Sequence, residues 1–420
     1  MNVLMSAYSC RPESGSESGV GWRFAAEVAK RHEVWVITDG SNRPSIEEWY
    51  NGQVPRNPRF VYHSVAFCPG WLKRNQFGVQ LHYYLWQRTL TGAAAQLHRQ
   101  VGFDVCHHTV WARYWMPSGL ADLGVPFVWG PIGAAESLPT GFSHGLGLRA
   151  RALENLRDLA RLAAHLDPAL NRTASSAAVT LVTTEATGER VLALGSQRIQ
   201  QMPTVGFSAA ELQYFQNLPD PDTSVFRAIC IGRLLHWKGF HLAIKAFAQF
   251  HRKCPRSELW IVNDGPERAR LEKLAQRSGV GQTVRFWGRL ASLGDVHSKL
   301  SQCQVLIHPA LHESFGNVCT EAMASGRPVI CLDTGGPATQ VTADSGFKVR
   351  PSSEEDAVQG IADALEHLCE DPLLCARLGR GAQQRVAREF SNDALMARLT
   401  RLYQEAAVAG GSRRVANNAQ

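Results

Sequence analysis

Short apolar runs typical of β-strands recur along this chain, and segments of helix-like composition separate them. In the first half these runs are MNVLMSAY, EVWVITD, RFVYHSVA, DVCHHT, PFVWGP and AVTLVTT. Strands that alternate with helices form a parallel sheet, because a crossover through a helix brings the chain back to the edge where the previous strand began. The pattern therefore predicts a parallel α/β sheet in this half of the chain.

The same alternation begins again in the second half, with RAICIGRL, ELWIVND, TVRFWG, VLIHP, PVICLD and GFKVR. Between the halves, residues 203–224 are rich in Pro, Asp and Gln and have weak apolar periodicity, which is typical of a domain connection. A chain of 420 residues also exceeds what one core usually organises. We predict α/β domains at 1–205 and 206–390, a helix at 391–408 that packs back toward the first domain, and a disordered tail at 409–420.

The amino-terminal sequence MNVLMSAYSCRPESG lacks a basic segment followed by a long apolar one, and nowhere do 18 apolar residues run together. We therefore expect neither export nor membrane spanning, and place the protein in the cytoplasm or on the inner face of the cell membrane.

The 10 cysteines are scattered without a CxxC pair or a Cys/His cluster, which argues against a zinc site and against a disulfide framework. The net charge of +7 would favour anionic ligands, but the lysines and arginines are spread throughout the chain. Charge alone names no partner, and we predict no nucleic-acid binding and no metal.

The stretch HESFGNVCTEAMASG follows the strand-like run VLIHP and reads as a loop and then a helix from Gly316 to Ala324. In open α/β sheets, ligands bind where strands end and helices begin. The backbone N–H groups of Phe315, Gly316 and Asn317, together with the positive end of the helix dipole, would suit a phosphate. Gly316 has no Cβ and lets the backbone approach a ligand closely.

Two glutamates lie on either side of this predicted phosphate site. Glu321 is more than one turn into the helix, too far for a phosphate, but it could accept hydrogen bonds from a vicinal diol such as ribose. Glu313 precedes the helix and can reach the other side of the phosphate. The pair is therefore predicted to bracket a nucleotide, the alternative being a solvated loop and helix face.

This region, HPALHESFGNVCTEAMASGRPVI, resembles the retaining glycosyltransferases of family 4 (glycosyl transferases group 1), whose hallmark is E-x7-E. The resemblance covers about residues 228–345. It implies the GT-B fold, in which two Rossmann-like domains with parallel sheets face each other across a cleft. It also implies that Glu321 binds the ribose hydroxyls and that Glu313 contacts the transferred sugar beside the diphosphate.

Other segments extend the resemblance. GRLLHWKGF is similar to the family's G-R-x4-K-G element, which implies that Arg233 and Lys238 hold the diphosphate and stabilise its developing charge. TVRFWGRL is similar to the strand and loop whose backbone reads the base, here Gly288, Arg289 and Leu290.

Two further turns match the family with departures. IVNDGPER resembles its GxGP turn, with Asn263 where glycine is usual. DTGGPA resembles its Gly-Gly turn, with Ala338-Thr339 in place of Pro-Glu.

In the first half, GSESGVGW follows the first strand, and we expect it to open a helix near Val20. The family has a glycine-rich loop here that lines the cleft, which implies that Gly15 and Gly19 lie near the donor phosphates. Together with Gly21, these glycines could equally do no more than make a turn.

The run DVCHHTVW places His107 and His108 at the carboxyl end of a strand. A cleft-facing histidine recurs near this position in the family, so both are candidate catalytic residues. Interior histidines with satisfied hydrogen bonds are the alternative.

The segments WLKRNQFGVQLHYYLWQR (71–88) and RARALENLRDLARLAAHL (149–166) combine bulky apolar residues with basic ones at helical spacing. They could dock on anionic lipid or present an acceptor surface. The alternative is a basic solvated face whose apolar stripe packs in the core.

The resulting prediction is a metal-independent, retaining hexosyltransferase acting in polysaccharide or glycolipid biosynthesis. Its partners would be a nucleotide diphosphate-sugar donor, a saccharide or lipid-linked acceptor, and a membrane surface if the basic segments dock there. The alternatives are a sugar-nucleotide epimerase or hydrolase, and a non-catalytic peripheral-membrane protein that binds polyanions.

Overall fold

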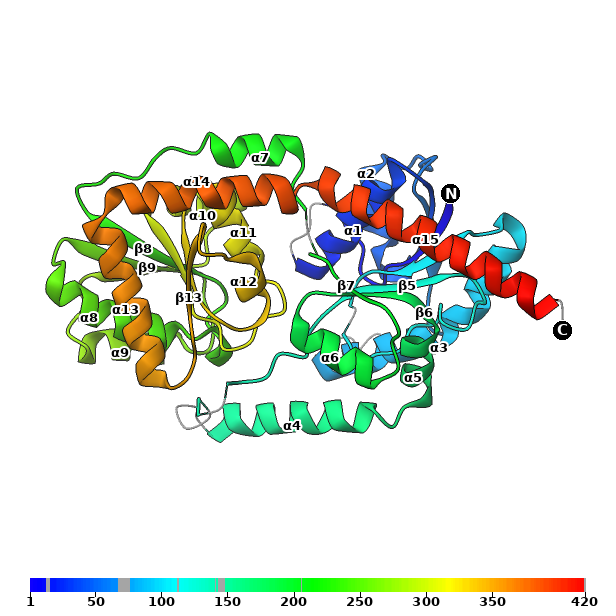
Figure 1. Ribbon diagram of the computed structural model, residues 1–420, viewed down its shortest axis with the longest axis horizontal. Helices are drawn as coiled ribbons and strands as arrows, with labels where there is room; N and C mark the ends of the chain where they lie inside the picture. Colours follow the sequence, from blue (N-terminus) through cyan, green and yellow to red (C-terminus); the bar gives the residue numbers. More distant parts are fainter. Residues whose placement is uncertain are drawn as a thin grey trace. The chain divides into compact units, whose positions relative to one another are not determined.

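Two compact units make up the chain, each built on its own parallel sheet (Figure 1). The computed structural model describes residues 1–12, 16–66, 76–111, 113–139, 141–142, 148–204 and 206–418. The N-terminal unit comprises residues 1–135, 156–205 and 392–420, and the C-terminal unit comprises residues 136–155 and 206–391. The domain ranges predicted from the sequence differ from these units at 136–155, where the described side chains of Glu136 and Glu154 contact residues of the C-terminal unit.

The N-terminal unit contains a seven-stranded sheet of order β3-β2-β1-β4-β5-β6-β7, with every neighbouring pair parallel. The strands are β1 (Asn2–Ser6), β2 (Glu33–Asp39), β3 (Arg59–His63), β4 (Val105–His108), β5 (Phe127–Ile132), β6 (Ala177–Val182) and β7 (Ile199–Gln201). Its helices are α1 (Ser16–Ala29), η1 (Gly40–Asn42), α2 (Arg43–Trp49), α3 (Gln76–Val101), α5 (Pro168–Ser176), α6 (Glu185–Ala193) and α15 (Asn392–Asn418), and α4 (Leu148–Ala164) crosses the division between the units.

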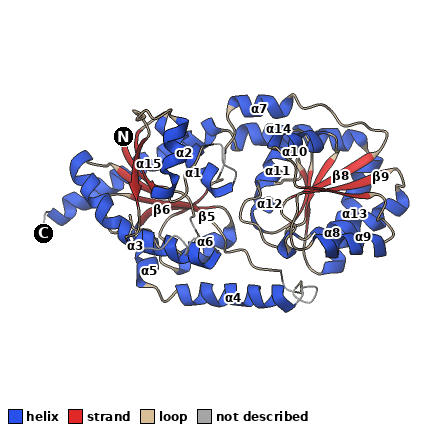
Figure 2. Ribbon diagram, turned by 180° about the vertical axis from the view of Figure 1, so that it is seen from behind, coloured by secondary structure: helices blue, strands red, loops and turns tan. Residues whose placement is uncertain are grey.

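Both faces of this sheet are covered, which explains why central strands such as β1 (NVLMS) and β5 (FVWGPI) carry apolar residues at successive positions. Successive side chains of a strand point to opposite faces. On β1, Val3 and Met5 pack in one core with α1 and α15, while Leu4 packs in a second core with Tyr83 and Trp86 of α3. Figure 2 shows helices on both sides of the strands in this unit.

The C-terminal unit has a six-stranded parallel sheet of order β10-β9-β8-β11-β12-β13. Its strands are β8 (Phe226–Ile231), β9 (Ser257–Val262), β10 (Val284–Gly288), β11 (Val305–His308), β12 (Val329–Leu332) and β13 (Gly346–Val349). Its helices are α7 (Ala209–Gln216), η3 (His236–Lys238), α8 (Phe240–Lys253), α9 (Arg268–Arg277), α10 (Leu293–Ser301), α11 (Asn317–Ala324), α12 (Gly335–Gln340), α13 (Glu354–Glu370) and α14 (Pro372–Glu389). The prediction of two parallel α/β sheets is confirmed.

Three details depart from the sequence analysis. Strand β7 went unpredicted because its three residues, Ile199–Gln201, carry little apolar signal. Helix α1 begins at Ser16, before the expected start near Val20. Helix α15 continues to Asn418, through most of the range that the sequence analysis expected to be disordered.

Helix α15 packs on the N-terminal unit through the apolar residues that the sequence placed at helical spacing. These side chains are buried in one core with strands β4, β5 and β6, and they are Leu395, Met396, Leu399, Leu402 and Tyr403. Among the helices that the structure describes, none has the length and apolar character needed to cross a bilayer.

Candidate active site

The loop that follows β8 presents Arg233 and Lys238 at the carboxyl edge of the C-terminal sheet. After η3 the chain turns at Gly239, which has a φ of 68° in the left-handed region. A Cβ atom at Gly239 would lie 1.9 Å from the carbonyl oxygen of Pro309, so only glycine lets the two backbones meet. This close approach holds Lys238 beside the loop that follows β11.

Lys238 forms an ion pair with Glu313, in which the ammonium donates to Glu313 Oε2. The two side chains are 17% and 20% exposed, so the pair is largely screened from water. Burial alone would raise the pKa of the Glu313 carboxyl, but attraction to the Lys238 ammonium outweighs it and holds this pKa far below its usual range. Glu313 is therefore a carboxylate at neutral pH.

His308 is a residue of this site that the sequence analysis did not assign. It ends β11, is 1% exposed, and its Nε2 lies 3.8 Å from Glu313 Oε2. Neither ring nitrogen has a hydrogen-bond partner among the described residues. Burial lowers its pKa, so the ring is neutral at physiological pH. The sequence signal that could have identified His308 is its position as the polar residue at the end of the otherwise apolar run VLIHP.

The amino end of α11 lies directly after this loop. Gly316 precedes the helix with φ 84° and ψ 67°, and no side chain caps the helix there. Asn317 is the first helical residue and is half-buried, while Phe315 is buried. The first N–H groups of a helix have no partner within the helix, so this end offers hydrogen-bond donors and a positive dipole to an anion.

The Gly-Gly turn at the start of α12 holds the Glu313 loop in place. The N–H of Gly336 donates to the carbonyl oxygen of Glu313 at 2.7 Å, and Gln340 Nε2 donates to that of Phe315 at 2.7 Å. A Cβ atom at Gly336 would lie 2.4 Å from the Cα of Phe315. The turn thus depends on the two glycines, and the departure at Ala338-Thr339 leaves this contact intact.

Glu136 also contacts the Glu313 loop. Its Oε2 accepts a hydrogen bond of 2.8 Å from Ser314 Oγ, and the side chain is buried. This contact joins residues 136–155 to the C-terminal unit. No local motif predicts this contact, because the two residues lie far apart along the chain.

Glu321 lies in α11, just over one turn after Asn317, and its side chain is 28% exposed. Its Oε2 is 4.0 Å from His297 Nε2, and burial lowers the pKa of His297. The glutamate therefore sits beside a neutral imidazole, with part of its carboxylate open to solvent.

The loops that follow β9 and β10 support the same edge of the sheet. Asn263 has a φ of 96°, which explains why glycine would be usual there, and its N–H donates to the Gly288 carbonyl at 2.8 Å. Gly288 itself has a φ of 68°. Arg289 is exposed and Leu290 is half-buried, and both follow β10 at the edge of the sheet.

We expect Asn263→Val to lower the free energy of unfolding by about 1–2 kcal/mol, since a β-branched residue is strained at positive φ. Asn263→Gly should stay close to the wild type, because glycine adopts this conformation freely. Urea unfolding of the three proteins measures the difference. Equal losses in both variants would show that the side chain of Asn263, not its backbone conformation, is what matters.

The structure corrects the role suggested for the two histidines. His107 is fully buried, and its ring nitrogens hydrogen-bond with the Tyr403 hydroxyl and with the Gly130 carbonyl oxygen, the latter at 2.6 Å. His108 is equally interior, with its nitrogens 2.9 Å from Tyr83 Oη and 3.0 Å from Ser118 Oγ.

Burial lowers the pKa of His107 to about 4 and that of His108 to about 3. Both are neutral core residues with satisfied nitrogens, so neither offers a nitrogen to a ligand.

The N-terminal glycines are only partly described. Gly15 lies outside the described residues, whereas Gly19 is buried within α1. A Cβ atom at Gly21 would lie 2.2 Å from the carbonyl oxygen of Ser9, so this glycine lets the helix pack against the preceding loop. Among the described residues, no three of His, Cys, Asp or Glu lie close enough together to hold a metal ion.

Comparison with solved structures agrees with this architecture. The chain superimposes on sucrose-phosphate synthase from Thermosynechococcus elongatus with a TM-score of 0.63 at 19% identity, over 97% of this chain and 99% of that one. It superimposes on Anabaena HepE in complex with UDP with a TM-score of 0.58 at 18% identity, over 95% and 98% of the two chains. The fold is therefore GT-B, the class of two Rossmann-like units found in glycosyltransferases.

Comparison of sequences gives matches that lie mainly in the C-terminal unit. Residues 216–385 match the family described as Glycosyl transferases group 1. The chain is 31% identical over 170 residues to the lipopolysaccharide core biosynthesis glycosyltransferase LpsD of Rhizobium meliloti. This alignment covers 40% of the present chain and 47% of LpsD. The chain spans about half the length of the curated relatives it matches.

Proposed function

We propose that this protein is a retaining glycosyltransferase that moves a hexose from a nucleotide diphosphate-sugar to a hydroxyl of a saccharide or lipid-linked acceptor. The observation that carries the proposal is the Lys238–Glu313 pair beside the uncapped amino end of α11. Arg233 is exposed on the same loop as Lys238 and makes no ion pair with a described residue. Two cations and a helix amino end are what a diphosphate needs.

The proposed reaction breaks the bond between the anomeric carbon and the phosphate oxygen and forms one to the acceptor oxygen. The acceptor proton passes to an oxygen of the leaving diphosphate, on the face from which that group departs. Lys238 and Arg233 stabilise the charge that develops on the diphosphate, and Glu313 holds the Lys238 ammonium in position. We propose that no metal ion is needed, because the two cations supply the positive charge.

A glycosidase-like reaction is less well supported by this geometry. Such an enzyme needs one carboxylic acid that is protonated near neutral pH. The pKa of Glu313 is lowered and not raised, since the Lys238 ammonium favours its charged form over the opposing effect of burial. Glu313 is thus suited to hold a cation and unsuited to donate a proton.

The donor is identified by measuring the melting temperature of the protein in buffer that contains EDTA. UDP, GDP, ADP and the corresponding nucleotide-sugars are added one at a time. A nucleotide at 100 times its Kd should stabilise the protein by about 2.7 kcal/mol. UDP is the first choice, because the structurally similar HepE was solved with UDP. If no nucleotide or nucleotide-sugar changes the melting temperature, the proposed donor class is wrong. If stabilisation needs a metal ion, the proposed metal independence is wrong.

We expect Glu321→Ala to weaken nucleotide binding by about 10- to 100-fold, because hydrogen bonds between ribose and a charged carboxylate are lost. The donor KM should rise while kcat changes little. Glu355→Ala, which removes an exposed glutamate of α13, is the matched control and should bind like the wild type. A Glu321→Ala protein with unchanged affinity would remove Glu321 from the donor site.

The two basic amphipathic segments behave differently in the structure. In the first, residues 71–75 lie outside the described residues; Tyr83 and Trp86 are buried in the core of the N-terminal unit, while Leu81 and Leu85 are exposed. In the second, four of the five leucines have described side chains, and these four are exposed. Arg161 is buried, donates to the Ala134 carbonyl and pairs with Asp158 at 3.1 Å. The apolar stripe of this second segment is not packed in a core.

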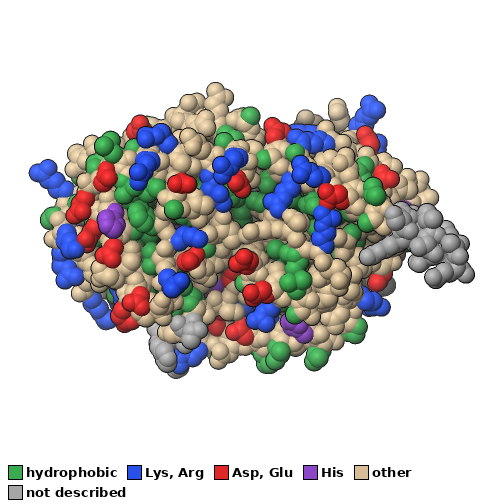
Figure 3. Space-filling model, viewed as in Figure 1, with side chains coloured by type: hydrophobic (Ala, Val, Ile, Leu, Met, Phe, Trp, Pro, Cys, Tyr) green, Lys and Arg blue, Asp and Glu red, His purple; other side chains and the backbone are tan. Residues whose placement is uncertain are grey.

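These four leucines, on α4 and the turn after it, are Leu156, Leu159, Leu162 and Leu166, with exposures of 63%, 62%, 69% and 83%. Their spacing of three or four residues puts them on one side of the helix. Figure 3 shows hydrophobic side chains at the lower edge of the visible face, where Figure 1 draws α4. We propose that this leucine face contacts the apolar boundary of a membrane that carries a lipid-linked acceptor.

Replacing Leu156, Leu159 and Leu162 by serine should reduce binding to phospholipid vesicles at least about ten-fold, because each leucine loses apolar burial. Vesicle sedimentation measures the change. The matched control replaces the scattered exposed leucines Leu192, Leu293 and Leu373 by serine. Equal vesicle binding by both triple variants would show that α4 is not the contact surface.

A further inference from the structure

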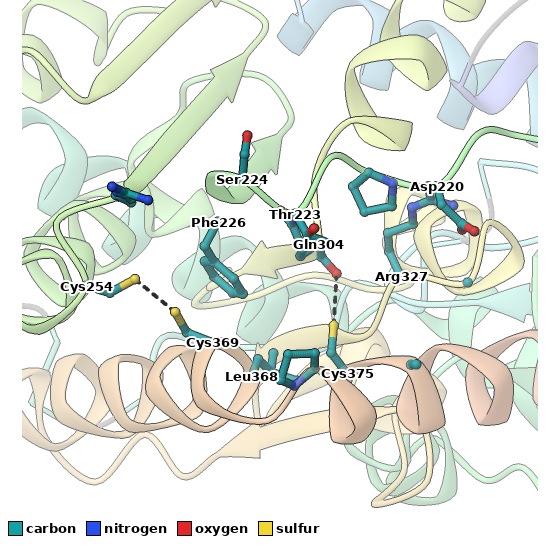
Figure 4. A pocket seen from close by; sticks show the side chains of 15 residues that line it. Asp220, Thr223, Ser224, Phe226, Cys254, Gln304, Arg327, Leu368, Cys369 and Cys375 are labelled. Atoms are coloured by element: carbon teal, nitrogen blue, oxygen red, sulfur yellow. Dashed lines mark hydrogen bonds between the residues drawn. The ribbon is translucent and has the colours of Figure 1, made fainter.

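A cavity of about 470 Å³ opens at the amino-terminal edge of the C-terminal sheet (Figure 4). Phe226, the first residue of β8, and Arg327, just before β12, contribute to its walls. Lys238 and Glu313 follow the carboxyl ends of β8 and β11. The strands run in parallel, so the cavity lies at the edge opposite to the proposed donor site.

Two cysteines meet in the wall of this cavity. Cys254 Sγ and Cys369 Sγ are 2.9 Å apart, and both are free, half-buried thiols. Figure 4 shows the two sulfur atoms pointing toward one another. A disulfide bond is about 2.05 Å long, so the sulfurs need to approach by only about 0.9 Å.

The two cysteines belong to helices that pack on each other. Cys254 directly follows α8 and its N–H donates to the Phe250 carbonyl at 3.0 Å, while Cys369 is in the last turn of α13. The same helices are joined by the ion pairs Lys245–Glu354 at 2.5 Å and Lys253–Glu366 at 2.8 Å. The helix packing therefore fixes the position of both thiols.

A third thiol lines the cavity but takes no part in this contact. Cys375 of α14 points its Sγ at the carbonyl oxygen of Gln304, 3.7 Å away. Burial and the hydrogen bond with Cys254 raise the pKa of Cys369 to about 12. Thiolate is the nucleophile in exchange reactions, so the raised pKa makes Cys369 a poor first nucleophile, and we assign the first attack to its partner.

We propose that Cys254 and Cys369 are a redox-modification site, which closes to a disulfide by exchange with a low-molecular-weight disulfide entering the cavity. The Cys254 thiolate attacks one sulfur of the small disulfide, forms a mixed disulfide and releases one small thiolate. Cys369, losing its proton to solvent, then attacks the Cys254 sulfur and releases the second small thiolate. Two protein thiols and one small disulfide thus become one protein disulfide and two small thiols.

The closed disulfide would link residues separated by 115 positions and would tie the end of α8 to α13. A cross-link over so long a loop restricts the unfolded chain, which raises stability. Helix α8 begins directly after Lys238 and Gly239, so oxidation fixes the helix that leads away from the proposed diphosphate-binding loop.

The test treats the reduced full-length protein with hydroxyethyl disulfide and maps its peptides without reduction. We expect one bridged peptide joining Cys254 to Cys369, a mass loss of two hydrogen atoms, and a melting temperature higher by roughly 5–10 °C. Dithiothreitol should reverse all three changes. A map of the wild-type protein in which these two cysteines stay reduced, or carry only small-molecule adducts, would overturn the proposal.

Single serine variants identify the pair. Cys254→Ser and Cys369→Ser should each lose the bridge and the rise in melting temperature, whereas Cys375→Ser should keep both. Each variant is first melted in reductant, and if a variant does not fold, the wild-type peptide map decides alone. A full rise in melting temperature in Cys254→Ser, from a bridge between Cys369 and Cys375, would assign the site to a different pair and refute ours.

Discussion

Lys238→Ala should lower the turnover of sugar transfer by about 10²- to 10³-fold, the usual cost of removing one preorganised group that stabilises developing charge. In the proposed reaction, its ammonium meets the departing diphosphate. The structure holds the ammonium there by the pair with Glu313 and by the turn at Gly239 against Pro309. Initial rates at saturating donor and acceptor measure the loss.

The control for this variant is Lys245→Ala. Lys245 belongs to α8 and pairs with Glu354 away from the proposed site, with 43% of its side chain exposed. The Lys245→Ala protein should transfer sugar at the wild-type rate. A Lys238→Ala protein that folds and turns over normally would contradict the proposed mechanism, because no other residue is assigned to take the place of this cation.

Glu313→Gln should reduce turnover by about 100-fold or more, since the amide cannot hold the Lys238 ammonium through a charged hydrogen bond. The donor affinity should change less, because Glu321 and the helix end remain. The ratio of the effects on kcat and KM separates this result from a simple loss of binding. Glu366→Gln, which removes a surface partner of Lys253, is the control and should leave turnover unchanged.

The same variant should change how stability depends on pH. The pKa of Glu313 in the folded protein lies below its value of about 4.3 in the unfolded chain. The stabilisation it provides is therefore complete above about pH 4.3 and is lost as the pH falls through the lower folded pKa. We expect the wild type to be more stable than Glu313→Gln at pH 7 and the difference to shrink on acidification, as measured by urea unfolding. A constant difference from pH 7 to 3 would contradict a charged Glu313.

The strands of both sheets were largely predictable, because most of them lie in short runs rich in apolar and β-branched residues, such as VLIHP or EVWVITD. Strand β7 was missed because three mostly polar residues give no such signal. The arginine–lysine loop and the two glutamates were predicted as site residues for a different reason. They occur within short local motifs whose spacing places them at strand ends.

The histidine prediction failed for a tertiary reason. His107 and His108 end a strand, as a ligand-binding residue would, yet the hydroxyls of Tyr403 and Tyr83 take up one nitrogen of each ring. Tyr403 lies 296 positions from His107 and belongs to the last helix. Nothing local to DVCHHT indicates that this helix packs there.

Local sequence was enough to predict most strands and helices, the two parallel sheets and the short motifs at the strand ends. These follow from local apolar periodicity and from residues close together in the chain. Long-range packing, in contrast, brings Lys238 to Glu313 and Cys254 to Cys369, and leaves four leucines of the α4 region exposed to solvent. Such outcomes depend on the packing of distant helices and loops, since burial and pairing are properties of neighbours in space and not along the chain.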